Sequence, residues 1–460
     1  RLDDEHTEVV VYKKTKGKKT DKIIYQRTFN NEETKELRLY GLEGNDEFIF
    51  DGDVKKSIKV RAIGGDDEDL FKDFSKVSGP GKKTLIYDNK TGNELELGQE
   101  SKNKTSTNPE VNNYNRKAFQ YNYVGPLLAL SFNPDDGVFI GGGAHITTHA
   151  WRKTPFQSDH IIAANIAVAT ASFFVKYEGQ FSDVIGKSDL EINTEMRSPN
   201  YVTNFFGLGN DSQYNSELSI DYYRVRFRQF WFDAKMRLNF GKANSFKFGP
   251  ALQTVEVEDT PGRFISDFQN NGLDSATVFL RKWWAGLKSE LILDSRDNKR
   301  FPQRGVYWKT DMTWYYGLTD VSNNYSQFRT DLRFYYSFRV PARVTLANRL
   351  GFAQNFGDYE FHQANYLDGQ DQLRGYRKYR FAGKRSFYYN LEARIKLFKI
   401  RAFLIPTQIG LIGYWDTGRV WLAEDSSNNW HNAFGGGISV APASILSISF
   451  IYGFSEEGSY

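Results

Sequence analysis

Apolar and polar side chains alternate along residues 387–397. The first set comprises Phe387, Tyr389, Leu391, Ala393, Ile395 and Leu397, and the second comprises Tyr388, Asn390, Glu392, Arg394 and Lys396. Side chains of a β-strand point to opposite faces with a period of two residues. The segment is therefore predicted to be a strand with an apolar face and a charged face, and the charged face needs water or a polar interior.

The same alternation recurs through residues 116–460, with no helical pattern between the predicted strands. A soluble β-sandwich would bury the apolar faces, whereas a transmembrane β-barrel would turn them to lipid and the charged faces to its lumen. At roughly 20 residues per strand and connection, this segment allows about 16 strands. We predict an all-β fold in which residues 116–460 form a 16-stranded antiparallel transmembrane β-barrel.

Composition favours the barrel over the sandwich. Aromatic residues make up 16% of the 460 residues, as is usual for barrels with aromatic girdles at both membrane interfaces. The mean hydropathy of −0.57 does not argue against a membrane protein, because only alternate residues of a barrel strand face lipid. No run of about 18 apolar residues predicts a transmembrane helix, and the absence of cysteine excludes disulfides.

Residues 1–98 predict a separate small β-rich domain. Short β-branched or aromatic runs are separated by Gly, Asn, Asp and Lys turns. Residues 37–50 align without gaps on residues 58–71, an offset of 21 residues. Repeats of about 20 residues are typical of stacked β rungs. Residues 99–115 are polar and poor in apolar side chains, and we predict that they form a linker.

The turns of this repeat leave calcium open as an alternative. Gly44-Asn45-Asp46 and Gly64-Gly65-Asp66-Asp67 resemble the glycine–aspartate calcium repeats of β-rolls, and oxygen ligands at turns can bind Ca²⁺. The other interpretation is that Gly and Asp supply only turn geometry and solubility. Two degenerate copies do not define a β-roll. We therefore expect no cofactor, with Ca²⁺ at Asp46, Asp66 and Asp67 as the alternative.

The sequence contains no pattern that predicts catalysis. Its six histidines are scattered, and His145 and His149 lie in a predicted strand without an accompanying carboxylate motif, so no metal site is expected. The glycine runs 141–143 and 435–437 lack the Lys-Ser/Thr that follows a phosphate loop. Basic and aromatic residues interleave with a period of two, which the barrel already explains. We expect neither an enzyme nor a nucleic-acid partner.

Four stretches carry a resemblance to a known family: residues 294–305, 373–376, 390–394 and 414–421. In this order they resemble the signatures of the BamA/TamA-type outer-membrane assembly superfamily, the bacterial surface antigen barrels, which also include two-partner-secretion transporters. The resemblance covers about residues 116–454. It implies a barrel in the outer membrane of a Gram-negative bacterium, with residues 1–115 in the periplasm.

The resemblance also implies two groups of functional residues. In the family, a loop arginine is held inside the barrel by two wall carboxylates, and a guanidinium can bind a carboxylate bidentately. The corresponding residues here are Arg374, Gly375, Tyr376, Glu392, Asp416 and Gly418. The alternative is that the three charges are solvated in the lumen, each with its own partners. The second group is expected to cap a periplasmic turn through Asx-type bonds and comprises Asp294, Arg296, Asp297, Pro302 and Gly305.

The function implied is insertion or translocation of proteins, or of lipids, at the outer membrane. The partners would be membrane lipid and client outer-membrane proteins or accessory subunits, and a seam between strands near residues 129–145 and 445–454 would open. One alternative is a membrane anchor or export conduit for an upstream hydrolase domain, and another is a passive pore. Residues 1–115 lack the helices of POTRA modules, and the chain begins at Arg1 without a signal sequence. We expect the C-terminal part of a longer protein, similar to Bacteroidetes proteins in which such a barrel follows a metallophosphoesterase.

Overall fold

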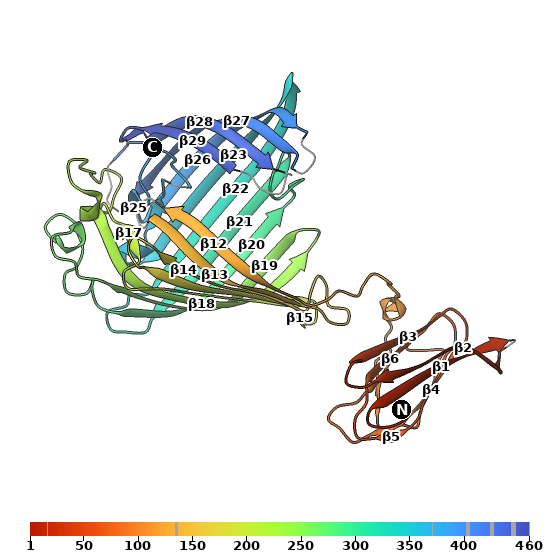
Figure 1. Cartoon of the computed structure of the whole chain (residues 1–460). Helices are drawn as coiled ribbons and strands as arrows, with labels where there is room; N and C mark the ends of the chain where they lie inside the picture. Colours follow the sequence, from red (N-terminus) through yellow and green to blue (C-terminus); the bar gives the residue numbers. More distant parts are fainter. Residues whose placement is uncertain are drawn as a thin grey trace. The chain divides into compact units, whose positions relative to one another are not determined.

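The computed structural model describes residues 1–15, 17–133, 137–369, 371–401, 405–423, 427–442 and 448–459 (Figure 1). Contacts between residues divide the chain into two compact units, Arg1–Gln120 and Tyr121–Tyr460. Both units are built from β-strands, with short 3-10 helices in the connections. None of the helices in the ranges given above has the length and apolar composition needed to cross a membrane.

The N-terminal unit contains a stack of parallel β rungs and an antiparallel hairpin of β1 (His6–Thr15) and β2 (Lys18–Asn30). The first parallel sheet contains β3 (Glu36–Leu42), β6 (Lys59–Gly65), β9 (Thr84–Tyr87) and β11 (Ser101–Asn103). The second contains β4 (Glu47–Phe50), β7 (Leu70–Asp73) and β10 (Glu94–Leu97), and the third contains β5 (Asp53–Val54) and β8 (Lys76–Val77). Their buried side chains form one core of Leu37, Phe50, Ile58, Val60, Ala62, Phe71 and Ile86.

Successive rungs are stacked, but with an offset of 23 residues where the sequence alignment predicts 21. Leu37 pairs with Val60 and Phe48 pairs with Phe71 in parallel register. The predicted offset is therefore wrong by two residues. A shift of two residues leaves every side chain on the same face of its strand, so apolar alternation does not distinguish the two offsets.

The segment predicted as a linker, residues 99–115, is partly folded onto this unit. β11 pairs in parallel with β9, and the 3-10 helix η1 (Pro109–Asn112) buries Val111. Asn112 Nδ2 donates to Asp88 Oδ1 at 3.1 Å. The polar composition predicts exposed side chains. It does not predict the main-chain hydrogen bonds by which this segment completes the last rung.

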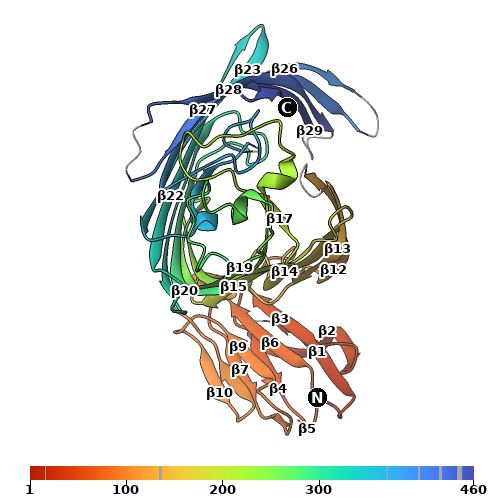
Figure 2. The ribbon, with the colours of Figure 1, turned by 90° about the vertical axis from the view of Figure 1, so that its left-hand side faces the viewer.

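The second unit is one antiparallel sheet that curves round a lumen (Figure 2). Its described residues form 17 strand segments. Since β16 and β17 lie end to end against β18, the segments make up the predicted 16 strands. The segments are β12 (Tyr123–Asn133), β13 (Gly137–Thr148), β14 (Ser158–Ala167), β15 (Phe173–Ile185), β16 (Ser188–Arg197), β17 (Val202–Asn204), β18 (Arg224–Phe240), β19 (Asn244–Val257), β20 (Lys282–Asp294), β21 (Gly305–Gly317), β22 (Tyr325–Val340), β23 (Ala342–Gly357), β26 (Arg385–Ile400), β27 (Thr407–Trp421), β28 (His431–Pro442), β29 (Ile448–Ser455) and β30 (Gly458–Ser459).

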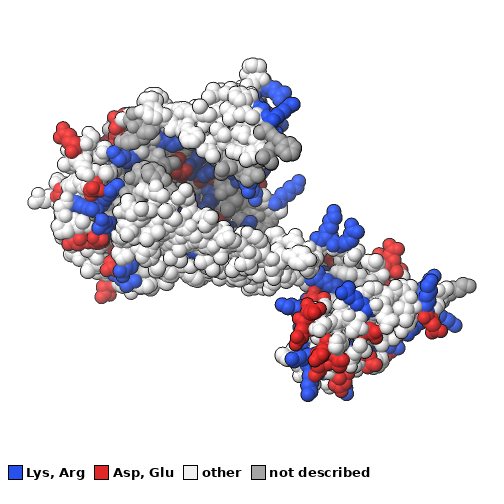
Figure 3. All heavy atoms as spheres, in the orientation of Figure 1, with Lys and Arg blue, Asp and Glu red and all other residues white. Residues whose placement is uncertain are grey.

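The strands of this unit have an apolar outer face and a charged inner face, as the alternation predicts. On β22, Phe334, Tyr336 and Phe338 are exposed, whereas Arg329 and Asp331 form ion pairs with neighbouring strands. In the space-filling view, the visible outside of the barrel carries few Lys, Arg, Asp or Glu side chains, which gather in the hollow and at the rims (Figure 3). Strands of 10 residues or more are long enough to cross the hydrocarbon layer of a bilayer.

The connections at one end of the barrel pack into a second core. The 3-10 helices η2 (Ile220–Tyr223), η3 (Phe264–Ser266) and η4 (Phe361–Gln363) lie in these connections. The core joins loop and strand residues and comprises Phe205, Val225, Phe227, Ala251, Val255, Val257, Ile265, Val278, Trp284, Tyr315, Tyr325 and Phe361. The loops are therefore folded structures with their own buried residues.

Candidate functional site

The loop between two short paired strands, described for residues 368–369 and 371–380, lies inside the barrel. β24 (Asn365–Leu367) pairs antiparallel with β25 (Phe381–Gly383), and both contact the wall strand β27. Loop and wall share one buried apolar cluster, which comprises Leu367, Leu373, Tyr376, Phe381, Tyr388, Val420 and Ala433. Burial of these side chains holds the loop against the inner wall and positions the neighbouring Arg374 beside polar wall residues.

Arg374 binds the two carboxylates that the sequence singles out. Its Nε and Nη2 each lie 2.8 Å from one oxygen of Asp416, and its main-chain nitrogen donates to Asp416 Oδ2 at 3.1 Å. Its Nη1 donates to Glu392 Oε2. Asp416 on β27 is fully buried, so this bidentate ion pair is shielded from water and is stronger than an exposed one.

The aromatic ring of Tyr414 completes the arginine site. The guanidinium carbon of Arg374 lies 3.8 Å from the centre of this ring, within the range of a cation–π interaction. A Cβ at Gly453 would lie 2.2 Å from the Tyr414 hydroxyl, so the glycine on β29 provides the space that the ring occupies. The sequence places Tyr414 on the same face as Asp416, but it gives no signal for the role of Gly453.

The other predicted members of the loop group lie in the same place. Gly375 has a φ of +101°, a conformation that glycine adopts readily, and a Cβ there would lie 3.3 Å from the carbonyl oxygen of Phe454. The Tyr376 hydroxyl donates to the carbonyl of Asn432 at 3.1 Å. Gly418 lies beside Leu367, whose Cδ1 would be 3.1 Å from an added Cβ. The structure thus brings all six predicted residues together.

A second tie between loop and wall has the opposite polarity and was not predicted. Arg349 on β23 binds both carboxylate oxygens of Asp371 in the loop, at 2.7 and 2.9 Å. Arg349 also binds Asp331 on β22, and the Tyr388 hydroxyl donates to the same carboxylate at 2.9 Å. Arg349 of the wall therefore binds a carboxylate of the loop. Three residues further along the loop, Arg374 binds carboxylates of the wall.

A third tie connects the end of the loop with two other connections of the barrel. Arg380 is buried and donates to Glu457 Oε1, to Ser212 Oγ at 2.9 Å and to the Ser212 carbonyl at 2.6 Å. No family motif in the sequence marks Arg380, and its partners lie 77 and 168 residues away. Pairing over such distances depends on the fold of the connections, which alternation does not predict.

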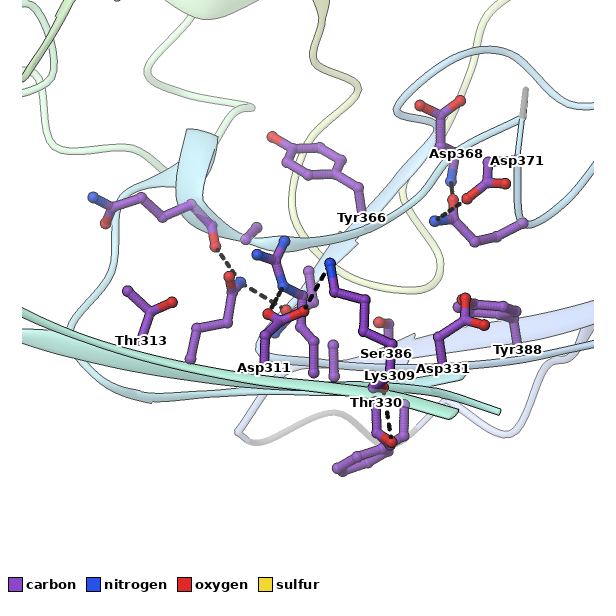
Figure 4. A pocket seen from close by; sticks show the side chains of 18 of the residues that line it. Lys309, Asp311, Thr313, Thr330, Asp331, Tyr366, Asp368, Asp371, Ser386 and Tyr388 are labelled. Carbon is purple, nitrogen blue, oxygen red and sulfur yellow. Dashed lines mark hydrogen bonds and ion pairs between the residues drawn. The ribbon is translucent and has the colours of Figure 1, made fainter. Parts of the chain in front are cut away.

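A polar cavity of about 640 Å³ lies between the loop and strands β18–β23 and β26 (Figure 4). Tyr366, Asp368 and Asp371 enter it from the loop side, and Asp311 and Tyr388 enter it from the wall. Cationic and anionic side chains line it together, and several are already paired with each other, as Arg329 is with Asp311. The cavity is far too small to hold a folded protein.

The predicted turn group forms one structure between β20 and β21. Arg296 Nε and Nη2 donate to the two carboxylate oxygens of Asp294 at 2.9 and 2.8 Å. Asp297 Oδ1 accepts from the main-chain nitrogens of Gln303 and Arg304 at 2.9 and 3.2 Å. Pro302 is buried, and Gly305 is the first residue of β21. The carboxylates bind main-chain and arginine donors, as expected for a capped turn.

The residues considered for calcium are not brought together. Asp66 and Asp67 are exposed, and Asp67 accepts a hydrogen bond from the main chain of Gly44 at 3.1 Å. Asp46 instead donates its main-chain N–H to Asp69 Oδ1 at 2.7 Å. Across the described ranges, no group of three or more His, Cys, Asp or Glu side chains is arranged to hold a metal ion.

An antiparallel barrel with an apolar exterior, a charged lumen and a loop tied across that lumen defines the class of outer-membrane β-barrels with an internal plug. The chain belongs to the Omp85 superfamily: the model of the Omp85 superfamily domain matches residues 178–458, more than half of the sequence. Barrels of this superfamily reside in the bacterial outer membrane and act in transport and assembly, not as enzymes.

One solved structure shows the same fold at low sequence identity. BamA from Haemophilus ducreyi lacking POTRA domains 1–3 is 13% identical with a TM-score of 0.53, and the match covers 73% of this chain and 67% of that one. CdiB from Escherichia coli (10% identity, TM-score 0.45) and CdiB from Acinetobacter baumannii (14%, 0.42) each match 73% of this chain, over 58% and 56% of their own lengths. No match was found among curated proteins.

Proposed function

We propose that this barrel inserts proteins into the bacterial outer membrane or moves them across it, with lipid as the alternative cargo. Membership of the Omp85 superfamily supports a role in transport or assembly. The choice between insertion and secretion depends on the client. The proposed partners are outer-membrane lipid, client proteins and accessory subunits, and we place residues 1–115 in the periplasm.

The observation that carries the proposal is the set of three ties that hold loop 368–380 in the lumen. They are made by Arg374 with Asp416, by Arg349 with Asp371 and by Arg380 with Glu457. A passive pore needs an open lumen, whereas a loop tied at three points obstructs it. A client must therefore displace the loop or pass along the barrel wall. The ion pairs of Arg374 with Asp416 and Glu392 would then control displacement of the loop.

We place the route for clients at the junction between the first and last barrel strands. Glycine-rich stretches lie next to this junction, at residues 141–143 on β13 and 435–437 on β28. Glycine in a strand contributes no side-chain packing and weakens pairing. The predicted seam, residues 129–145 and 445–454, includes residues 134–136 and 445–447, which lie outside the described residues. In the described residues the sheet ends at β12 on one side and at β29 with the two-residue β30 on the other, and no pairing joins these ends. We expect clients to enter between them.

Reconstitution into liposomes tests the proposal. A urea-unfolded outer-membrane β-barrel would be added, and its assembly followed as heat-modifiable, protease-resistant protein. We expect faster assembly with the wild-type chain than with empty liposomes, and a loss of most of this gain with Asp416→Asn. Arg228→Ala removes one of two exposed ion-pair partners 3.7 Å apart and should behave as wild type. Equal assembly in empty liposomes and in liposomes that contain the wild-type chain would overturn the proposal.

A second candidate is an anchor or export conduit for an enzyme domain in the same polypeptide. It is favoured by the parallel rungs of the N-terminal unit, a compact β structure suited to connect a barrel to another domain. An immunoblot of outer membranes with an antibody against residues 1–98 distinguishes the candidates. A band well above the 53.0 kDa of this chain favours the anchor, and a band near that mass counts against it.

A further inference from the structure

Two buried carboxylates face each other between the rungs of the N-terminal unit. Asp69 lies in the turn between β6 and β7, and Asp88 follows β9 on the next rung. The exposed fraction is 2% for Asp69 and 0% for Asp88. The Oδ2 atoms of both residues converge on one point, the position that a Cβ of Gly64 would occupy, at 2.3 and 2.1 Å from it.

The outer oxygens of these carboxylates are satisfied, but the facing oxygens are not. Asp69 Oδ1 accepts from the main chain of Asp46 at 2.7 Å, and Asp88 Oδ1 accepts from the main chain of Asn89 at 2.6 Å. In the described part of the chain, Asp69 Oδ2 and Asp88 Oδ2 are buried without any hydrogen-bond donor. Buried polar atoms are nearly always paired, so two unpaired carboxylate oxygens at one point require a positive partner.

Asn112 of η1 also contacts Asp88, through its side-chain amide nitrogen. Asn112 donates through Nδ2 to Asp88 Oδ1 and to the carbonyl of Gly65, and its Oδ1 is also buried without a donor in the described residues. A single proton shared by Asp69 and Asp88 would leave the Asn112 oxygen unpaired. A cation coordinated by several oxygens can satisfy all three. The space above Gly64 exists because that residue has no side chain.

Burial also makes two ionised carboxylates costly in this place. It raises the pKa of Asp69 to about 7, with further contributions from the Asp88 and Asp46 carboxylates. Burial likewise raises the pKa of Asp88. At neutral pH the pair therefore gains from any positive charge bound between the carboxylates.

We propose that Asp69 and Asp88, with the side-chain oxygen of Asn112, bind one hard divalent cation of the Ca²⁺ type. Oxygen donors from carboxylates and amides, completed by main-chain carbonyls or water, are the ligands that Ca²⁺ prefers. The ion would join two successive rungs and η1, the segment that continues toward the barrel. Asp46 on the preceding rung adds negative charge nearby.

The test uses the full chain in detergent after treatment with a chelator. Equilibrium dialysis with ⁴⁵Ca²⁺ should detect one bound ion in the wild type, lost or weakened at least tenfold in Asp69→Asn and in Asp88→Asn. Asp66→Asn is the matched control, because Asp66 is an exposed carboxylate of the same turn, and it should bind as the wild type does. Equal binding by Asp69→Asn and the wild type would overturn the proposal.

A second measurement uses only the wild-type chain, so it does not depend on whether the variants fold. Ca²⁺ added to the chelated wild-type chain should slow proteolysis of residues 36–103 at least tenfold and leave cleavage of the barrel loops unchanged. No protection up to about 10 mM Ca²⁺, above the range of weakly binding extracellular sites, would also overturn the proposal. In that case the carboxylates share a proton.

Discussion

Arg374 of the loop and Asp416 of β27 are joined by three hydrogen bonds, two from the guanidinium and one from the main-chain nitrogen. The main-chain bond fixes the loop backbone, and the bidentate bond fixes the direction of the side chain. Because Asp416 is fully buried, this carboxylate depends on the loop arginine for its charge balance. We therefore expect the loop position and the stability of the wall to be coupled.

Arg374→Ala should release the loop. It leaves a buried carboxylate without its cation, which costs about 3–5 kcal/mol. Hydrogen exchange in residues 371–380 should rise roughly a hundredfold or more, since 1.4 kcal/mol corresponds to a factor of ten. Arg374→Lys should recover only part of the protection because it lacks the guanidinium fork. The control Arg228→Lys, at an exposed pair, should change exchange little. Unchanged loop exchange in Arg374→Ala would contradict the tie.

The two opposite ion pairs should act together on the loop. Asp371→Asn removes the carboxylate that Arg349 binds, while Arg374 still holds the loop three residues further on. We expect Asp371→Asn alone to lower the free energy of loop opening, as measured by hydrogen exchange, by about 1 kcal/mol or less. The reason is that the Asp371 side chain is 57% exposed. In the background of Arg374→Lys, the same substitution should have a clearly larger effect. Strict additivity in this double-mutant cycle would show that the ties are independent.

Gly375→Ala should destabilise the loop by about 1–2 kcal/mol. A left-handed φ costs roughly this much for a residue with a side chain, and the added Cβ would lie 3.3 Å from the Phe454 carbonyl oxygen. Gly413→Ala is the matched control on β27, because a Cβ there meets no described atom within 4 Å. Thermal unfolding in detergent should separate the variants. Equal melting temperatures for both would contradict the close contact of Gly375 with β29.

The N-terminal unit should lose stability as the pH rises from about 4 to 7 when no divalent cation is present. The Asp69 carboxyl ionises near pH 4 in the unfolded chain, but its folded pKa is raised to about 7. Between these values the folded state binds more protons than the unfolded state, so raising the pH favours unfolding. Asp46 and Asp88, the neighbouring carboxyls with raised pKa values, shift stability in the same direction.

Hydrogen exchange of residues 36–103 checks this pH dependence of stability. It is measured in the presence of a chelator at several pH values and corrected for intrinsic exchange. The fall should amount to a few kcal/mol, at about 1.4 kcal/mol per unit of raised pKa. It should be smaller in Asp69→Asn and unchanged in Asp66→Asn. A stability that rises from pH 5 to pH 7 would contradict the prediction.

Alternation of side chains was enough to predict the barrel, because a period of two and a charged face are local properties of each strand. It placed Glu392 and Asp416 on the inner face, where both meet Arg374. Arg349 and Asp371 could not be found in this way. Many charged residues share the inner face, and their partners depend on strand register and loop path, which the alternation leaves open.

The N-terminal unit illustrates the same limit. The sequence indicated stacked rungs, but matching glycine–aspartate turns gave an offset two residues too short, so that Asp46 was aligned with Asp67. In the structure Asp46 lies beside Asp69, and Asp88 joins from a third rung with no matching turn. Parallel register is set by packing of the core, with Leu37 on Val60, rather than by the similarity of turns.

A cysteine cross-link tests most directly whether the loop lies inside the barrel. The chain has no cysteine, and an added Cβ at Gly375 would lie 3.5 Å from the Cβ of Ala433 on β28, a separation that suits a disulfide. In outer membranes under mild oxidation, Gly375→Cys with Ala433→Cys should form this disulfide, whereas Gly375→Cys with Gly413→Cys should not. Absence of the first cross-link, with position 375 labelled by a membrane-impermeant maleimide, would contradict a loop held in the lumen.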